Sequence, residues 1–160
     1  RYKQFAHEGG IATPLIAHWP RGIRAPGRVN HQPGHVIDIM ATCLELAGTA
    51  YPRELGGRAL TPLEGISFAP TFADRPRREH PVIYWEHQGS RAVRAGEWKL
   101  VATRADGTHW SLHNMARDRT ELHNLAEAQP ERVGELNALY EDWAQRCNVL
   151  PFDEMMQARG

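Results

Sequence analysis

The sequence lacks a long hydrophobic run. Its most apolar stretches, residues 11–19 and 36–47, are short, and polar or ring-constrained residues interrupt them, such as Pro14 in the first and Asp38 in the second. A transmembrane helix needs about twenty consecutive apolar residues. We therefore expect no membrane-spanning helix in this sequence.

An excess of charge of one sign is also missing. The 160 residues include 19 Lys and Arg against 19 Asp and Glu, so the formal net charge is +0 at pH 7. Binding to nucleic acid or to an anionic membrane usually relies on a strong positive field. We therefore expect neither nucleic acid nor a membrane as a partner.

Cysteine is scarce. Cys43 and Cys147 lie far apart and form no metal or redox pair motif, so we expect both to be small core residues. The chain starts at Arg1 without a methionine, and we expect it to be a piece of a longer protein. The lack of a signal-like segment therefore does not decide the compartment.

Nine histidines raise the question of a metal site. His31 and His35 are separated by proline and glycine, so no helix aligns their rings. His109 and His113 fall on one face of a predicted strand but about 13 Å apart, too far for one zinc ion. We expect no metal site within this chain.

The first half of the chain predicts few regular elements. Residues 11–19 are apolar on both faces, which is typical of a short buried strand. Residues 36–47 have apolar side chains at helical spacing, and Gly48 follows as a helix-ending residue. Residues 50–80 predict a long loop with one helical turn near 67–72. This half is consistent with the edge of a mixed α/β sheet.

The second half predicts an antiparallel sheet and a helix. Four short β-rich runs lie within residues 81–113, separated by turn signals at Gln88-Gly89, Ala95-Gly96 and Asp106-Gly107, of which the last favours a type I′ hairpin. Apolar residues at spacings of three and four then predict a helix over 131–147. The fold class expected is α/β, becoming α+β in the second half: the edge of a mixed sheet, then a four-stranded antiparallel sheet packed by a C-terminal helix.

Two groups of polar residues are candidates for a functional site. Lys3 and His7 precede Gly9-Gly10, and paired glycines allow a close backbone approach that suits a turn lining a site, although a solvated charge cluster is the simpler interpretation. His87 and Arg91 flank the turn at Gln88-Gly89, where loop tips often contact ligands or simply stay solvated. Most tryptophans fall on predicted sheet or helix positions, which favours a core role over a sugar-stacking platform.

Several motifs, in order along the chain, together resemble the arylsulfatase family of the alkaline-phosphatase-like superfamily. They are Lys3-Gln4-Phe5-Ala6-His7-Glu8-Gly9-Gly10, Trp19-Pro20, His35-Val36-Ile37-Asp38-Ile39-Met40, Gly57-Arg58-Ala59-Leu60, Gly65-Ile66-Ser67-Phe68, Tyr84-Trp85-Glu86-His87, Gly96-Glu97-Trp98-Lys99-Leu100-Val101 and Asp118-Arg119-Thr120-Glu121.

The resemblance implies that this chain is the C-terminal portion of a sulfuric ester hydrolase. Residues 1–75 would end the catalytic α/β domain, and residues 76–160 would form the C-terminal subdomain. Lys3 matches the lysine that donates to the substrate sulfate, whereas His87, Arg91 and His7 are candidates for the substrate pocket. Calcium and a formylglycine are implied for the complete enzyme, but this chain lacks the motifs for both, so it is expected to be inactive alone.

The resemblance also implies a sulfate ester substrate, the N-terminal catalytic part of the same protein as partner, and a periplasmic or secreted location. Two alternatives stay open. One is a free-standing module that binds sulfated or acidic glycans. The other is a phosphate or phosphonate ester hydrolase of the same superfamily.

Overall fold

The structure is a computed structural model that describes residues 1–24, 27–107 and 109–157. The chain divides into two compact units, one made of residues 1–14 together with those from 81 onward, and the other of residues 15–80. The start of the chain thus belongs with its second half. The boundary expected between residues 75 and 76 concerns the domains of a complete enzyme and stays a prediction. Among the described residues, no helix is both long and apolar enough to cross a membrane.

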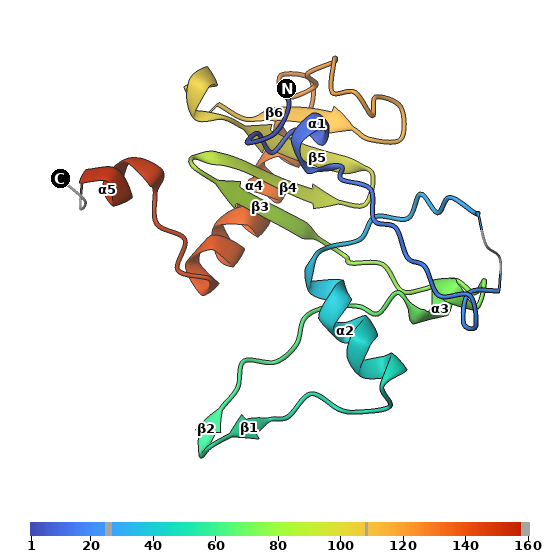
Figure 1. Cartoon of the computed structure of the whole chain (residues 1–160). Helices are drawn as coiled ribbons and strands as arrows, with labels where there is room; N and C mark the ends of the chain where they lie inside the picture. Colours follow the sequence, from blue (N-terminus) through green and yellow to red (C-terminus); the bar gives the residue numbers. More distant parts are fainter. Residues whose placement is uncertain (25–26, 108, 158–160) are drawn as a thin grey trace. The chain divides into compact units, whose positions relative to one another are not determined.

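The first unit contains a four-stranded antiparallel sheet in which each strand pairs with its neighbours in the chain (Figure 1). The sheet and the long helix were both predicted from the sequence, and both are confirmed. The elements of this unit are α1 (Glu8–Ile11), β3 (Ile83–His87), β4 (Ser90–Ala95), β5 (Trp98–Ala102), η1 (Arg104–Asp106), β6 (Ser111–Asn114), α4 (Pro130–Arg146) and α5 (Phe152–Gln157).

Two of the three predicted turns are tight hairpins. Gln88 and Gly89 both have positive φ, 53° and 78°, as a type I′ turn requires between paired His87 and Ser90. The type I′ hairpin expected at Asp106-Gly107 is wrong. Only Gly107 has positive φ there, and Asp106 ends the 3₁₀ helix η1, so the Asp-Gly pair closes a helical turn rather than a hairpin.

The sheet is covered on both faces. On one face, side chains of the sheet pack against α4 in a core made of Val93, Leu100, Leu112, Leu136, Tyr140 and Ala144. On the other face, Ala92 and Val101 pack against Ala6 of the N-terminal segment. Because successive strand residues point to opposite faces, the central strands β4 and β5 bury side chains in both layers, Val93 and Leu100 against α4 and Ala92 and Val101 against the N-terminal segment. The predicted core role of the strand and helix tryptophans is confirmed, since all four pack against these two clusters.

The second unit contains one clear helix and little other regular structure. Its elements are α2 (Ile37–Leu46), β1 (Glu54–Leu55), β2 (Arg58–Ala59) and α3 (Ala69–Phe72). The predicted helix stop at Gly48 is confirmed. Gly48 has φ 64°, its N–H donates to the Glu45 carbonyl at 3.1 Å, and the N–H of Thr49 donates to Leu44 at 3.1 Å. This bond pattern satisfies carbonyls that the end of a helix leaves without partners.

A buried carboxylate holds this unit together. Asp38, fully buried on α2, accepts hydrogen bonds from the backbone N–H of His35 at 2.9 Å and of Ile66 at 2.8 Å. Its oxygens also lie 3.1 Å from Arg77 and 2.7 Å from His80. Four partners around one carboxylate tie the helix to the loop that follows it.

Two sequence predictions are wrong in this structure. Residues 12–19 form no strand, and Leu15 and Ile16 are 60% and 88% exposed. A strand that is apolar on both faces needs paired neighbours, and no strand among the described residues pairs with this segment. Cys43 and Cys147 are exposed rather than core residues, because each lies just outside the buried stripe of its helix.

Candidate functional site: the N-terminal segment on the sheet

The candidate site is built on residues 1–11, which lie on the sheet face opposite α4. The side chain of Ala6 is buried against the sheet, and its N–H donates to the Ser90 Oγ at 2.9 Å. Arg1 donates to Thr103 Oγ1 at 3.0 Å and pairs with Asp106. The segment is therefore fixed to β4 and to the loop after β5, although only four of its residues are helical.

Gly9 and Gly10 let this segment fold back on itself. A Cβ added at Gly9 would lie 2.0 Å from the Arg1 carbonyl oxygen, and one at Gly10 would lie 2.1 Å from the Phe5 carbonyl oxygen. Real Cβ atoms do not approach so closely, so any larger residue would push residues 1–5 away from α1. The glycine pair acts here through close backbone approach rather than through positive φ, since neither glycine has one.

Lys3 lies in the part of the segment that folds back. Its backbone has φ 58°, the left-handed region, which costs a non-glycine residue about 1 kcal/mol or more. The side chain is exposed. Strained backbone at an exposed, charged residue motivates a functional hypothesis, because such strain persists only where the surroundings fix it.

A buried ion cluster lies behind this turn. The Lys99 side chain on β5 is fully buried, and its Nζ lies 3.1 Å from Glu8 Oε1 and 2.7 Å from Glu121 Oε1. The ammonium also lies 5.6 Å from the centre of the Trp85 ring. The other Glu121 oxygen accepts the backbone N–H of Glu8 at 2.8 Å, which satisfies a free donor at the start of α1.

Sequence reasoning missed this cluster. A signal did exist: Lys99 stands between Trp98 and Leu100 in a strand expected to be covered on one face by a helix. A lysine is almost never fully buried unless it is paired, so Lys99 at this place implies carboxylate partners. The partners lie 91 and 22 residues away, and no local pattern points to them.

His7 is half-buried beside the cluster. Burial lowers the pKa of its imidazole, and the positive charges of Lys99 and Arg1 lower it further, whereas Glu121 acts in the opposite direction. The Phe5 ring packs edge-on against it, with ring centres 6.4 Å apart. The neutral imidazole is favoured, which suits a hydrogen-bonding role near neutral pH.

The two loop-tip candidates lie on opposite faces of the sheet. His87 is exposed and pairs directly with Ser90, whose hydroxyl faces the N-terminal segment, so His87 shares the face of Lys3 and His7. Arg91 faces α4. Its guanidinium carbon lies 4.4 Å from the Trp110 ring centre, and its Nη1 lies 3.8 Å from Glu141.

The described residues offer no cluster of metal ligands. Within them, no three His, Cys, Asp or Glu side chains lie close enough together to hold a metal ion. Cys43 is followed by Leu44 and Cys147 by Asn148, so neither lies in the motif from which formylglycine is made. These residues do not fit calcium or a formylglycine, and no step below is derived through either.

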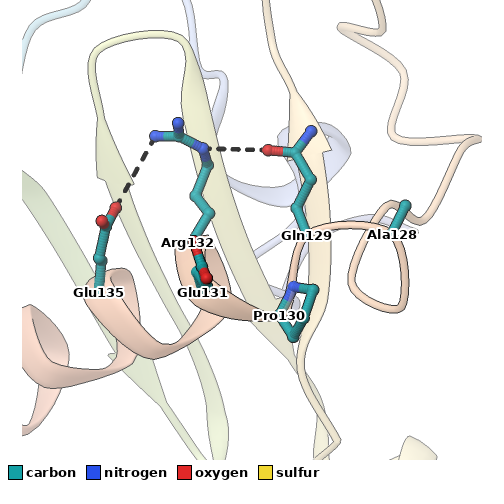
Figure 2. Close-up of a pocket in the computed structure, with 6 residues that line it drawn as sticks. All are labelled: Ala128, Gln129, Pro130, Glu131, Arg132 and Glu135. Atoms are coloured by element: carbon teal, nitrogen blue, oxygen red, sulfur yellow. Dashed lines mark hydrogen bonds and ion pairs between the residues drawn. The ribbon is translucent and has the colours of Figure 1, made fainter.

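A separate surface pocket lies at the start of α4 (Figure 2). Arg132 spans it, donating from Nε to Gln129 at 3.2 Å and pairing with Glu135 at 3.9 Å. None of the four site candidates lines it. Its lining residues are Ala128, Gln129, Pro130, Glu131, Arg132 and Glu135.

Comparison with known families identifies the domain. Residues 2–142 match the family model described as N-sulphoglucosamine sulphohydrolase, C-terminal. The chain belongs to this sulfatase C-terminal domain family. The resemblance to sulfatases inferred from the sequence is thereby confirmed.

Individual sulfatases are similar to the same region. An uncharacterized sulfatase of Schizosaccharomyces pombe is 34% identical over 139 residues, covering 84% of this chain and 25% of that protein. N-acetylgalactosamine-6-sulfatase of Canis lupus familiaris is 35% identical over 97 residues, covering 61% of this chain and 17% of that protein. A solved 2-O GAG sulfatase superposes with a TM-score of 0.52 at 28% identity, covering 70% of this chain and 25% of that one. The chain thus spans about a quarter or less of the length of these sulfatases.

Proposed function

We propose that this chain is the C-terminal part of an enzyme that hydrolyses sulfate esters of the arylsulfatase type, and that Lys3 contacts the substrate sulfate. One observation carries the proposal. In a domain of the sulfatase family, the exposed Lys3 lies on a strained turn held by Gly9-Gly10. The resemblance of residues 3–10 to the arylsulfatase motif, in which the lysine donates to the substrate sulfate, supports this role.

The chemistry explains why a lysine suits this place. Cleavage of the S–O bond by water moves negative charge onto the leaving-group oxygen and the sulfate oxygens. A compact ammonium on a flexible stem can follow that charge, and a preorganised contact of this kind contributes about 3 kcal/mol to the transition state. The exposed position keeps the ammonium available to a bound anion.

His7 and His87 are proposed to line the pocket for the rest of the ester, because both lie on the sheet face of Lys3. Arg91, on the opposite face, is proposed to support the hairpin that carries His87. The nucleophile and the calcium that such enzymes use are proposed to come from the N-terminal catalytic part of the same protein, in a periplasmic or secreted location.

The test compares substrates and lengths. The complete protein is assayed with an aryl sulfate, the matching aryl phosphate and aryl phosphonate, and with a 6-sulfated sugar, and the 160-residue chain is assayed beside it. We expect turnover of a sulfate ester by the complete protein only. Turnover of the phosphate or phosphonate without the sulfates would instead favour the related hydrolase class, and binding of sulfated glycans without any turnover would favour a binding module.

A further inference from the structure

The chain has only two lysines, and the proposed function uses one of them. Lys99, the other, is fully buried between two carboxylates and touches no solvent. A buried ammonium is costly to desolvate, and removing one member of such a cluster leaves uncompensated charge. Because burying this ammonium costs desolvation free energy, we ask which structural or functional role Lys99 serves.

The cluster joins three segments that are distant in sequence. Lys99 comes from the centre of the sheet, Glu8 from the start of α1, and Glu121 from the loop between β6 and α4. Glu121 bridges the other two, since one oxygen binds the Lys99 ammonium and the other accepts the Glu8 N–H. Its own backbone has φ 58°, so this loop is held in a strained conformation where it meets the cluster.

The backbone of Lys3 packs directly against α1. Gly10 follows two residues after Glu8, and a Cβ built there would lie 3.1 Å from the carbonyl oxygen of Lys3 and 2.1 Å from that of Phe5. The backbone of Lys3 therefore rests on the helix that Glu8 anchors. A shift of α1 would move the Lys3 backbone with it.

We propose that Lys99 is a positioning residue: by holding Glu8 and Glu121, its buried ammonium fixes α1 and so the point from which Lys3 reaches a sulfate ester. Lys99 itself touches no substrate. This inference rests on the proposed function for the role of Lys3, and it adds a residue outside the Lys3-to-Gly10 motif on which that role depends.

The first test is a double-mutant cycle in the complete protein, with Lys3→Ala, Lys99→Met and both together, assayed on an aryl sulfate. Displacing a catalytic group by about 1 Å can cost up to a hundredfold in rate, so we expect Lys99→Met to lower kcat by about tenfold or more. In the Lys3→Ala background it should change kcat by less than about twofold, because residues that act through one another are not additive. Effects that multiply would overturn the proposal.

The second test is amide hydrogen exchange of the complete protein, followed by mass spectrometry. Lys99→Met should accelerate exchange in residues 2–11 and leave β4 protected. If Lys99→Met does not fold, Glu8→Ala replaces it, because it removes the carboxylate by which Lys99 holds α1 and leaves Lys99 paired with Glu121. Unchanged exchange in residues 2–11 with either variant would overturn the proposal.

Arg77→Met is the matched control, since it removes another buried cation, that of the Asp38 ion pair. Arg77→Met should lower stability and leave exchange in residues 2–11 unchanged. Its effect on kcat should be the same in the Lys3→Ala background as in the unchanged protein. The two proposals fail differently. Full activity of Lys3→Ala would overturn the proposed role of Lys3 and the catalytic consequence of Lys99, whereas unchanged exchange would overturn Lys99 alone.

Discussion

The Nζ of Lys99 lies 2.7 Å from one carboxylate oxygen of Glu121, whose other oxygen accepts the backbone N–H at the start of α1. Through these contacts, the sheet face opposite α4 supports the N-terminal segment. The segment carries Lys3, the residue proposed to contact the sulfate, so the proposed site depends on residues that are far apart in sequence.

The glycine pair gives a direct test of the folded-back turn. Gly10→Ala should lower the free energy of unfolding by about 1–3 kcal/mol, because the added methyl group has no room beside the Phe5 carbonyl. Gly134→Ala on α4 is the control, since an added methyl there meets open space. It should raise stability by about 0.5–1 kcal/mol, because alanine favours a helix interior. Chemical denaturation measures both, and equal effects of the two variants would contradict the account of the turn.

The buried carboxylate of the second unit predicts a pH dependence. Burial raises the pKa of Asp38, but the backbone N–H groups of Ile66 and His35, with His80 and Arg77, outweigh it and hold the pKa below its ordinary value of 3.8. The folded state thus binds a proton more weakly than the unfolded state. The stability that this carboxylate contributes is present above pH 3.8 and is lost as the pH falls through the lower, folded-state pKa.

Asp38→Asn should therefore flatten the loss of stability in that acid range while lowering stability at neutral pH. Thermal unfolding followed from pH 7 down to pH 2 measures both effects. If the unfolding temperature fell as steeply with decreasing pH in Asp38→Asn as in the unchanged protein, the prediction would be contradicted.

Much of the fold could be predicted from the sequence, and particular residues show why. The turn at Gln88-Gly89, the helix stop at Gly48 and the apolar stripe of α4 depend on neighbours within a few residues, so the local pattern was sufficient to predict them. The strand expected at residues 11–19 depends on partners that pattern cannot supply. The same holds for the candidate site. Lys3 could be predicted because the neighbouring residues 4–10 mark it, whereas Lys99 and Glu121 come together only in the folded chain.

The two faces of the sheet predict different outcomes for the loop-tip residues. His87→Ala should raise KM for an aryl sulfate about fivefold, the cost of a lost hydrogen bond of about 1 kcal/mol. Arg91→Ala should leave KM within about twofold and lower stability by about 1 kcal/mol, because its guanidinium packs over Trp110. Steady-state kinetics and thermal unfolding of the complete protein separate them, and a larger KM effect from Arg91→Ala would reverse the assignment.

The most direct test of the whole account is the kcat/KM of Lys3→Ala in the complete protein, measured on one aryl sulfate. We expect a fall of about a hundredfold or more with unchanged thermal unfolding, since the role proposed for Lys3 places its ammonium against the reacting group alone. Lys3→Arg should recover part of the loss, because its planar guanidinium restores the charge without the lysine's point contact. Activity of Lys3→Ala within about twofold of the unchanged protein, as is usual for a solvated surface charge, would contradict the account.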